Sequence, residues 1–218
     1  MLYLCRWRYG TLSACFSSCS SSGSCWGLVF ELPALKRPKR PIIILAGLHG
    51  VGKSTYAKPL AEEFNLEYVS TGSVFRRIAR EKGLTVSQLS ELCMKTSEFD
   101  REIDSVTLSL LDSGGVVLDS LLAGWFARDV ESFKIFLKAS FETRCMRIAS
   151  RENRPLEEVV SETAAREDSE RRRFMEYYGF NIDDLGLYDM VLDTGVLSQG
   201  SVSRILKTAV SAYLEEKW

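Results

Sequence analysis

Short apolar runs alternate with longer stretches of helical periodicity along this chain from residue 42 onward. Runs rich in β-branched and aromatic side chains are typical of strands. They predict five strands, at 42–46, 67–70, 116–119, 133–137 and 190–194. The run Val116–Asp119 is apolar until its closing acid, which is the pattern of a central parallel strand with both faces covered.

Between these runs, apolar residues recur three and four positions apart, as on one face of a helix. The spacing of Ala57, Leu60 and Phe64 predicts a helix in which Pro59 removes one backbone hydrogen bond. Ser70–Ser73 predicts a turn. Further helices are predicted at Val74–Lys82, after a Thr85 cap, at Phe99–Leu111, around Arg144–Arg151, at Pro155–Tyr178 and near the C-terminus. Strands that alternate with helices predict an α/β fold with a mainly parallel sheet.

The composition is that of an ordinary globular protein, with 218 residues of which 45% are hydrophobic and 26% charged. A chain of this length suits one domain with a substantial core. The formal net charge of −1 gives no indication of a nucleic-acid partner. No apolar run approaches the roughly 20 residues of a membrane span. We therefore expect neither a nucleic acid nor a membrane as partner.

Residues 1–40 differ from the rest of the chain. They hold four of the six cysteines, a serine-rich stretch, and six basic residues against the single acid Glu31. No sustained helical or strand period runs through them, which favours a disordered or processed extension. An organelle transit peptide and a zinc site of Cys15, Cys19 and Cys25 remain alternatives. We place the domain boundary near residue 40 and expect residues 41–218 to form the folded domain.

The stretch after the first predicted strand carries the clearest chemistry. Gly47, Gly52, Lys53 and Ser54 have the spacing G-x-x-x-x-G-K-[ST] between a strand and a helix start. In this motif backbone N–H groups and the lysine hold a polyphosphate, and the hydroxyl coordinates Mg²⁺. We predict a nucleoside triphosphate site at Gly47, Leu48, His49, Gly50, Val51, Gly52, Lys53, Ser54 and Thr55. His49 is expected to be a solvent-facing residue of this loop.

Arginines elsewhere could bind further phosphate groups. Arg76 lies in a helix that follows the second predicted strand. Arg166, Glu170 and Arg173 fall at i, i+4 and i+7, so a helix places them on one face. The residues alone leave two interpretations open for these three. They form either a mobile lid that closes over a phosphoryl group or a charged helix face in solvent.

Seven motifs occur in order between residues 47 and 194. They are Gly47–Thr55, Val69–Gly72 with Phe75-Arg76, Leu122–Trp125, Arg144–Glu152, Arg166–Arg173, Tyr178–Leu185 and Tyr188–Thr194. On these motifs the chain from Ile42 onward resembles the archaeal-type cytidylate kinases, which are nucleoside monophosphate kinases. The resemblance implies a P-loop fold of three α/β/α layers with a central parallel five-stranded sheet. It also implies acceptor-binding helices at about 70–112 and a helical lid at about 152–180, which favours the lid interpretation.

The activity implied by this resemblance is transfer of the γ-phosphate of ATP to CMP or dCMP, with Mg²⁺, by a cytoplasmic monomer. Lys53 and the loop amides would hold the ATP phosphates. Ser54 and Asp119 would bind Mg²⁺, with Asp119 acting directly or through water. Arg166 and Arg173 would close over the transferring phosphate. The acceptor side would be formed by Ser70, Thr71, Arg76 and Glu170, the last of which would also orient the lid arginines.

The chain departs from the family pattern after the third predicted strand. Where the pattern is an acid followed by Gly-Arg-Leu-Ala-Gly-Trp, this chain has Ser120 for the glycine and Leu121 for the arginine. Leucine cannot donate to a phosphate, and the charge-assisted hydrogen bonds lost are worth about 1.5–3 kcal/mol. Weak activity, another acceptor such as AMP or UMP, binding without transfer, and compensation by Arg77 or Arg144 all remain open.

Five further residues have a simpler expected role. Cys93 and Cys145 are expected to be buried small hydrophobic residues. Asp100 and Asp104 share one face of a predicted helix and are expected to be solvated or paired with neighbours such as Arg101. Trp125 is expected in the core, and Asn181 stands where the family usually has aspartate.

Overall fold

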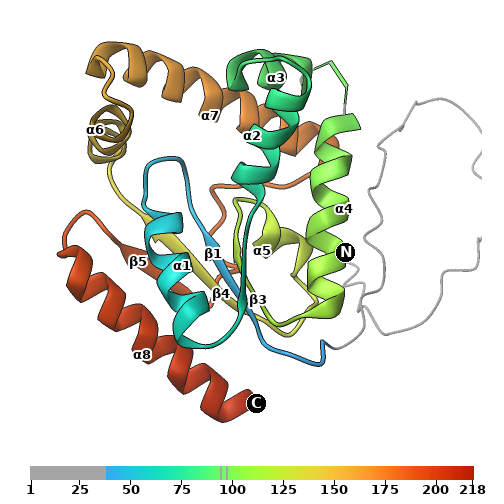
Figure 1. Ribbon diagram of the computed structural model, residues 1–218, viewed down its shortest axis with the longest axis vertical. Coiled ribbons are helices and arrows are strands. Elements are labelled where there is room, and N and C mark those ends of the chain that lie inside the picture. Colours follow the sequence, from blue (N-terminus) through green and yellow to red (C-terminus); the bar gives the residue numbers. More distant parts are fainter. Residues whose placement is uncertain (1–37, 94, 97) are drawn as a thin grey trace, which may run out of the picture.

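A computed structural model describes residues 38–93, 95–96 and 98–218 (Figure 1). Five strands form one sheet in the order β2-β3-β1-β4-β5, and every neighbouring pair is parallel. The strands are β1 (Ile42–Ala46), β2 (Glu67–Ser70), β3 (Val116–Asp119), β4 (Phe133–Lys138) and β5 (Met190–Asp193). The predicted parallel sheet is confirmed. Two of its three inner strands, β1 and β3, are buried along their whole length, as their apolar sequences require.

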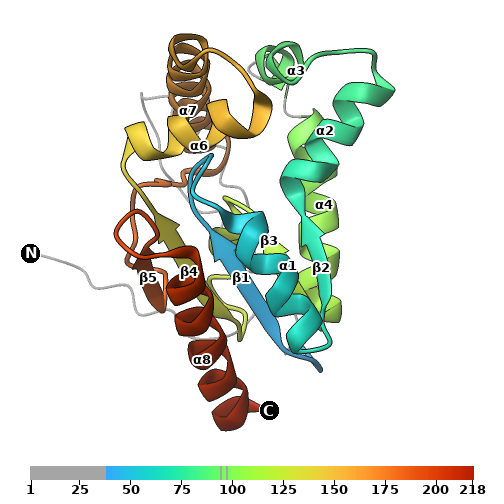
Figure 2. The ribbon, with the colours of Figure 1, turned by 60° about the vertical axis from the view of Figure 1, so that its left-hand side comes forward.

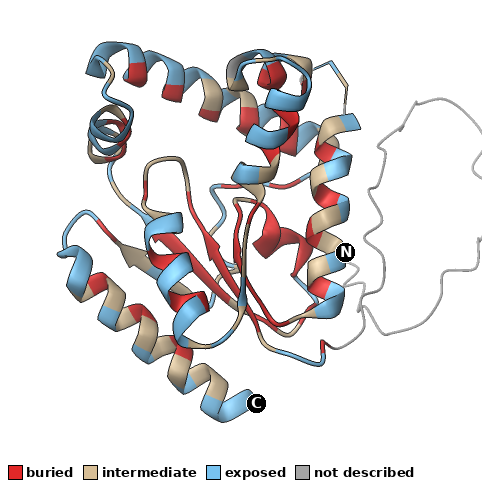
Figure 3. Ribbon diagram, in the orientation of Figure 1, coloured by how far each residue is buried: buried red, intermediate tan, exposed pale blue. Residues whose placement is uncertain are grey.

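Helices cover both faces of the sheet. In β1, Ile43 and Leu45 point to the face covered by α1 (Lys53–Glu63) and α8 (Gln199–Lys217). Ile42 and Ile44 point to the opposite face, where α4 (Glu98–Ser113) and α5 (Ala123–Phe126) pack. The buried strands lie between helices whose outer sides are exposed (Figure 3). The three-layer α/β/α architecture is thereby confirmed.

Four helices gather around the end of the sheet where the strands terminate. The helices α2 (Thr71–Glu81) and α3 (Val86–Cys93) pack with α4 around a small separate core that includes Phe75, Leu89 and Cys93. The helices α6 (Phe141–Glu152) and α7 (Leu156–Tyr178) lie together above the carboxyl ends of the strands (Figure 2). The C-terminal part of α7 reaches α3, where the Tyr177 hydroxyl donates to the carbonyl oxygen of Cys93 at 2.8 Å.

Local chemistry accounts for several helix ends. The N–H of Gln88 donates to the Thr85 hydroxyl at 3.1 Å, and the N–H of Thr85 donates to the Gln88 side chain at 2.8 Å. This reciprocal capping box confirms the predicted Thr85 cap of α3. Gly179 ends α7 in the left-handed conformation, with φ of 67°. Helix α7 therefore has a defined end just before Phe180.

Two local features differ from the sequence predictions. The turn predicted at Ser70–Ser73 is wrong, because β2 passes directly into α2 and the Ser73 hydroxyl donates to the Ser70 carbonyl at 2.6 Å. The short helix α5 was not predicted, since four residues are too few for a periodic pattern. Helix α1 continues through Pro59.

Most of the N-terminal segment, including the three cysteines of the possible zinc site, lies outside the described residues. None of the described helices is both long and apolar enough to cross a bilayer.

Candidate active site

The predicted functional residues meet at one edge of the sheet. In parallel sheets the carboxyl ends of the strands lie together and form the usual ligand site. Here β1 leads into the glycine-rich loop, β2 ends at Ser70, and β3 ends at Asp119. Ser70 and Asp119 are also register partners in the sheet. The fold therefore brings together residues that are far apart in the sequence.

Two glycines of the loop are required by its shape. Gly47 has φ of 138°, and a Cβ atom there would collide with the carbonyl oxygen of Leu137. Gly50 has φ of 79°, and its Cβ atom would lie 2.5 Å from the carbonyl oxygen of Arg144. Other residues rarely adopt these conformations, so the loop could pack this closely only with glycine at both positions.

Side chains from outside hold the carbonyl groups of the loop. Arg144 Nη1 donates to the carbonyl oxygen of His49 at 3.0 Å. The Thr194 hydroxyl donates to the carbonyl oxygen of Val51 at 3.0 Å, and Arg147 donates to Thr194. Carbonyls that are bound on the outer side leave the N–H groups of such a loop available to an anion on the inner side.

The lysine and serine of the motif lie at the start of α1. Lys53 Nζ folds back over the loop and donates to the carbonyl oxygens of Gly47 at 2.6 Å and Leu48 at 3.2 Å. Burial lowers the pKa of Lys53, although Asp119 and Glu170 oppose that shift. A cation held by carbonyl groups alone is available to a stronger anionic partner such as a phosphate.

Ser54 and Asp119 are in direct contact. The Ser54 hydroxyl donates to Asp119 Oδ2 at 2.5 Å, and the Tyr68 hydroxyl donates to the same oxygen at 3.2 Å. Hydroxyl and carboxylate oxygens are ligands that Mg²⁺ accepts, usually together with water and substrate phosphates. The pair thus fits a Mg²⁺–nucleotide complex. No group of three or more His, Cys, Asp or Glu side chains in the described part of the chain could form a metal site on its own.

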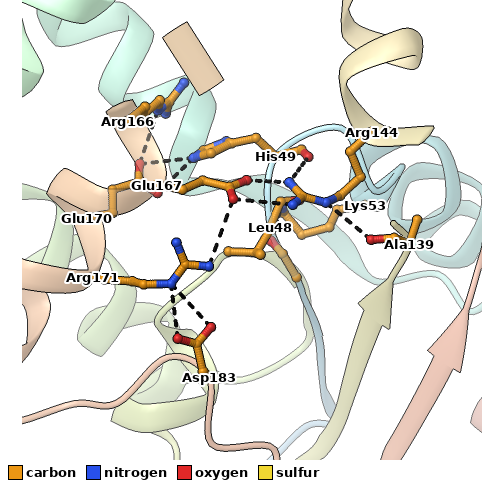
Figure 4. Close-up of polar contacts among 11 residues, drawn as sticks. Leu48, His49, Lys53, Ala139, Arg144, Arg166, Glu167, Glu170, Arg171 and Asp183 are labelled. Carbon is orange, nitrogen blue, oxygen red and sulfur yellow. Dashed lines mark hydrogen bonds and ion pairs between the residues drawn. The ribbon is translucent and has the colours of Figure 1, made fainter. Parts of the chain in front are cut away.

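The lid helix contacts the glycine-rich loop through Glu170 (Figure 4). His49 Nε2 lies 2.8 and 3.0 Å from the two carboxylate oxygens of Glu170, and Arg166 Nε donates to one of them at 3.1 Å. Burial by itself would raise the pKa of Glu170, but His49 and Arg166 bring it well below its usual range. The prediction that His49 faces solvent is wrong, because its imidazole has a partner on α7.

A second contact between the lid helix and α6 is deeply buried. The guanidinium of Arg144 forms a bidentate ion pair with the carboxylate of Glu167. Arg171 Nη2 also lies 4.0 Å from Glu167 Oε2 (Figure 4). The guanidinium of Arg144 is therefore already bonded both to the glycine-rich loop and to α7. Arg77 forms an exposed pair with Glu81. In this structure neither Arg77 nor Arg144 replaces the arginine that the family has at the position of Leu121.

Arg173 lies away from the loop, on the side of α3 and α4. Its Nε atom is 3.2 Å from Asp100 Oδ2, and its Nη1 donates to the carbonyl oxygen of Ser90 at 3.4 Å. Nearby, the Tyr178 hydroxyl donates to Asp104 at 2.6 Å. The prediction that Asp100 and Asp104 are solvated is wrong. Burial raises the pKa of Asp100 to about 6 and that of Asp104 to about 7.

The predicted acceptor residues lie at the end of β2 and the start of α2. The Thr71 hydroxyl donates to the carbonyl oxygen of Asp119 at 3.4 Å. A Cβ atom at Gly72 would lie 3.5 Å from Arg76 Nη1 and 3.7 Å from Ser70 Oγ, so both side chains border the same glycine. Arg76 is exposed on α2. The structure thus brings Ser70, Thr71 and Arg76 together next to Asp119.

The residues that depart from the family pattern have structural roles. Ser120 Oγ accepts a hydrogen bond from the Ala123 N–H at 3.2 Å, at the start of α5. Leu121 is half-buried and packs against the core on the α4 face. Trp125 is buried and stacks on Phe180 with ring centroids 5.1 Å apart, as expected of a core residue. Asn181 Oδ1 accepts from the Asp183 N–H at 3.2 Å and shapes the turn after α7.

Two contacts were not predicted from the sequence, that of Tyr68 with Asp119 and that of Asp100 with Arg173. Tyr68 belongs to the predicted strand that ends at Ser70, and its spacing of two residues from Ser70 was the available signal. Asp100 gave no signal of burial, since an acid on a helix is usually solvated.

A glycine-rich loop between a parallel strand and a helix, with a lysine, a serine–aspartate pair and an arginine-bearing helix beside the loop, is the arrangement of a P-loop kinase. The model of the cytidylate kinase-like family matches residues 42–196. The chain belongs to that family.

Several curated relatives support this membership over most of the chain. A protein named cytidylate kinase from Desulfurococcus amylolyticus is 40% identical over 176 residues, which are 80% of this chain and 95% of that protein. A cytidylate kinase from Aeropyrum pernix is 42% identical over 163 residues, covering 75% of this chain and 95% of the relative. The family resemblance on the seven motifs is confirmed.

Solved structures support the fold. A shikimate kinase from Acinetobacter baumannii aligns with a TM-score of 0.51 and 19% identity, over 82% of this chain and 96% of its own. A gluconokinase from Sinorhizobium meliloti also gives a TM-score of 0.51, at 13% identity, over 83% of this chain and 97% of its own. At such low identity these structures indicate a shared fold and nothing more.

Proposed function

We propose that this protein transfers the γ-phosphate of ATP to CMP or dCMP, yielding ADP and the corresponding diphosphate. Its family and the names of its relatives support this reaction. The observation that carries the proposal is the contact of the Ser54 hydroxyl with Asp119 Oδ2 at 2.5 Å beside the glycine-rich loop. This pair combines a loop hydroxyl with a strand-end acid, as required to bind a nucleotide with Mg²⁺.

On the donor side, Lys53 and the loop N–H groups bind the ATP phosphates. Lys53 exchanges its bonds to the Gly47 and Leu48 carbonyls for bonds to phosphate oxygens. Ser54 and Asp119 hold Mg²⁺, with Asp119 acting directly or through water. When bound with ATP, this ion neutralises charge on the phosphates and fixes their geometry.

On the acceptor side, Ser70, Thr71 and Arg76 bind the monophosphate. Its phosphate oxygen is already anionic, so attack on the γ-phosphorus needs no general base. The bond from the γ-phosphorus to the β,γ-bridging oxygen breaks, and ADP leaves. The protein contributes positioning and charge stabilisation, which are the main requirements of phosphoryl transfer.

The lid closes the site. Arg166 lies beside the loop and is oriented by Glu170, while Arg173 lies toward the acceptor helices. Arg166 acts on the transferring phosphate when the two nucleotides are bound, whereas Arg173, which the resemblance also assigns to that phosphate, is paired with Asp100 in this structure. Closure also excludes water, which suppresses hydrolysis of ATP.

A coupled assay of ADP release tests the proposal. We expect turnover with CMP and dCMP to exceed that with UMP, AMP and GMP, and to require Mg²⁺. Absence of turnover with every acceptor, in a sample that still binds ATP, would contradict the proposed enzyme.

We further propose that the protein acts as a monomer in cytoplasmic pyrimidine nucleotide metabolism. Mass spectrometry of the native N-terminus tests the location, because a cleaved leader would favour the transit-peptide alternative. Sedimentation of the purified protein tests the monomer.

A further inference from the structure

The ion pair between Arg173 and Asp100 is buried but incompletely hydrogen-bonded. The side chains are 3% and 7% exposed, and Arg173 Nε lies 3.2 Å from Asp100 Oδ2. Within the described residues, however, neither of these two atoms has a hydrogen bond of acceptable geometry. Buried polar atoms in native proteins nearly always have a hydrogen bond, so an exception calls for an explanation. Asp100 thus retains an unused acceptor position at a buried site.

The pair lies next to the proposed acceptor site. Arg173 follows Glu170 by three residues, and Glu170 is bonded to the glycine-rich loop through His49. At a rise of 1.5 Å per residue, the two positions are about 4.5 Å apart along α7. Asp100 is in the first turn of α4, and the Ser90 carbonyl that Arg173 also contacts belongs to α3. Arg173 and Asp100 therefore lie where α7 meets α3 and α4, on the proposed acceptor side.

The chemistry of the pair matches one pyrimidine and not the other. An ionised carboxylate can only accept hydrogen bonds, and a guanidinium can only donate them. Cytosine presents an amino donor at C4 and an acceptor at N3, whereas uracil presents an acceptor at C4 and a donor at N3. A carboxylate beside a guanidinium is complementary to the cytosine edge, and it repels the 4-carbonyl oxygen of uracil.

We propose that Asp100 is the specificity-determining residue that accepts a hydrogen bond from the amino group of cytosine, and that Arg173 positions its carboxylate. This inference rests on the proposed function. Adenine presents the same pattern of an amino group and a ring nitrogen acceptor. Asp100 thus separates cytosine from uracil, and the size of the site must separate cytosine from adenine.

The test is the ratio of kcat/KM for CMP to kcat/KM for UMP in Asp100→Asn. The amide has the shape of the carboxylate but can donate to the uracil 4-carbonyl. We expect kcat/KM for CMP to fall about 10- to 100-fold, the effect of losing a charged hydrogen bond. The value for UMP should stay constant or rise, so the ratio falls. Both values come from one preparation, so a partly unfolded sample lowers them equally.

The matched control is Asp104→Asn, which changes the neighbouring buried acid held by Tyr178. This variant should keep the wild-type ratio. An unchanged ratio in Asp100→Asn, or an equal change in both variants, overturns the inference. If turnover of Asp100→Asn is too slow, equilibrium binding of CMP and UMP to the folded variant gives the same ratio, and equal weakening of both overturns the inference. Absence of CMP turnover by the wild-type protein instead refutes the proposed function.

Discussion

His49 and Glu170 join the glycine-rich loop to the lid helix: the imidazole Nε2 lies 2.8 and 3.0 Å from the two carboxylate oxygens. The same carboxylate binds Arg166 on the preceding turn of α7. The position of the lid arginine is thus tied to the loop by a single shared acid. Loss of the imidazole should loosen the lid without removing any group from the phosphate site.

We expect His49→Ala to raise KM for ATP and to raise ATP hydrolysis in the absence of acceptor. Hydrogen bonds to charged groups contribute about 1.5–3 kcal/mol when buried. The His49 side chain is 24% exposed, so about 1 kcal/mol is expected here, or roughly fivefold in either quantity. ADP release with and without CMP measures the effect. His49→Gln, which keeps an N–H donor, should recover part of it, and identical hydrolysis in all three proteins would rule out the coupling.

Replacing Lys53 should abolish transfer. Its ammonium group is bonded to loop carbonyls in this structure, and in this motif the lysine reaches the β- and γ-phosphates. We expect Lys53→Ala to reduce kcat by more than about 100-fold, since electrostatic stabilisation of this kind is worth several kcal/mol. Thermal unfolding of the variant separates loss of transfer from loss of folding. Unchanged activity would show that the loop is not the donor site.

Leu121→Arg should improve the use of CMP. Leu121 is half-buried directly after the strand-end residues Asp119 and Ser120, where the family pattern has an arginine. A guanidinium there can donate to the acceptor phosphate. We expect kcat/KM for CMP to rise about tenfold, at the lower end of the value of a charged hydrogen bond. Leu121→Met controls for side-chain length. A loss of activity in the arginine variant would mean that the pocket has been rebuilt around leucine.

Asp104 should make stability depend on pH. Burial raises its folded-state pKa to about 7, above its unfolded value, with Tyr178, Asp100 and Arg173 around it. Its contribution is therefore complete below the unfolded pKa and is lost as pH rises through about 7. We compare the melting temperature of Asp104→Asn minus that of the wild type at two pH values. This difference should be at least about 3 °C larger at pH 8 than at pH 5. Thermal unfolding at the two pH values measures this difference, and a difference independent of pH would contradict the assignment.

The strands and the loop could be predicted because their signals are local. β2 and β3 begin and end at the predicted residues, Glu67–Ser70 and Val116–Asp119. In each case a polar side chain closes a short apolar run. The resemblance to the family implied that Ser54 and Asp119 share one site, and in the structure the two side chains are in contact.

The partners of buried charges could not be predicted in this way. His49 and Glu170 are 121 residues apart in the sequence, and no periodicity links a loop residue to a distant helix. Asp100 and Asp104 have the spacing of an exposed helix face, but α3 and α7 cover that face. Whether an acid is solvated depends on which helix packs over it, and that information is in the tertiary fold.

The 23-residue helix α7 has neither glycine nor proline between Leu156 and Tyr178, so it has no evident internal hinge. A single continuous helix therefore contains both Glu170, which is bound to the donor loop, and Arg173, which is bound to the helices on the proposed acceptor side. A displacement of α7 by one nucleotide must alter the contacts available to the other. By linkage, the factor by which ATP changes the affinity for the acceptor equals the factor by which the acceptor changes the affinity for ATP. The two substrates are thus expected to bind with mutual cooperativity, transmitted through a single helix.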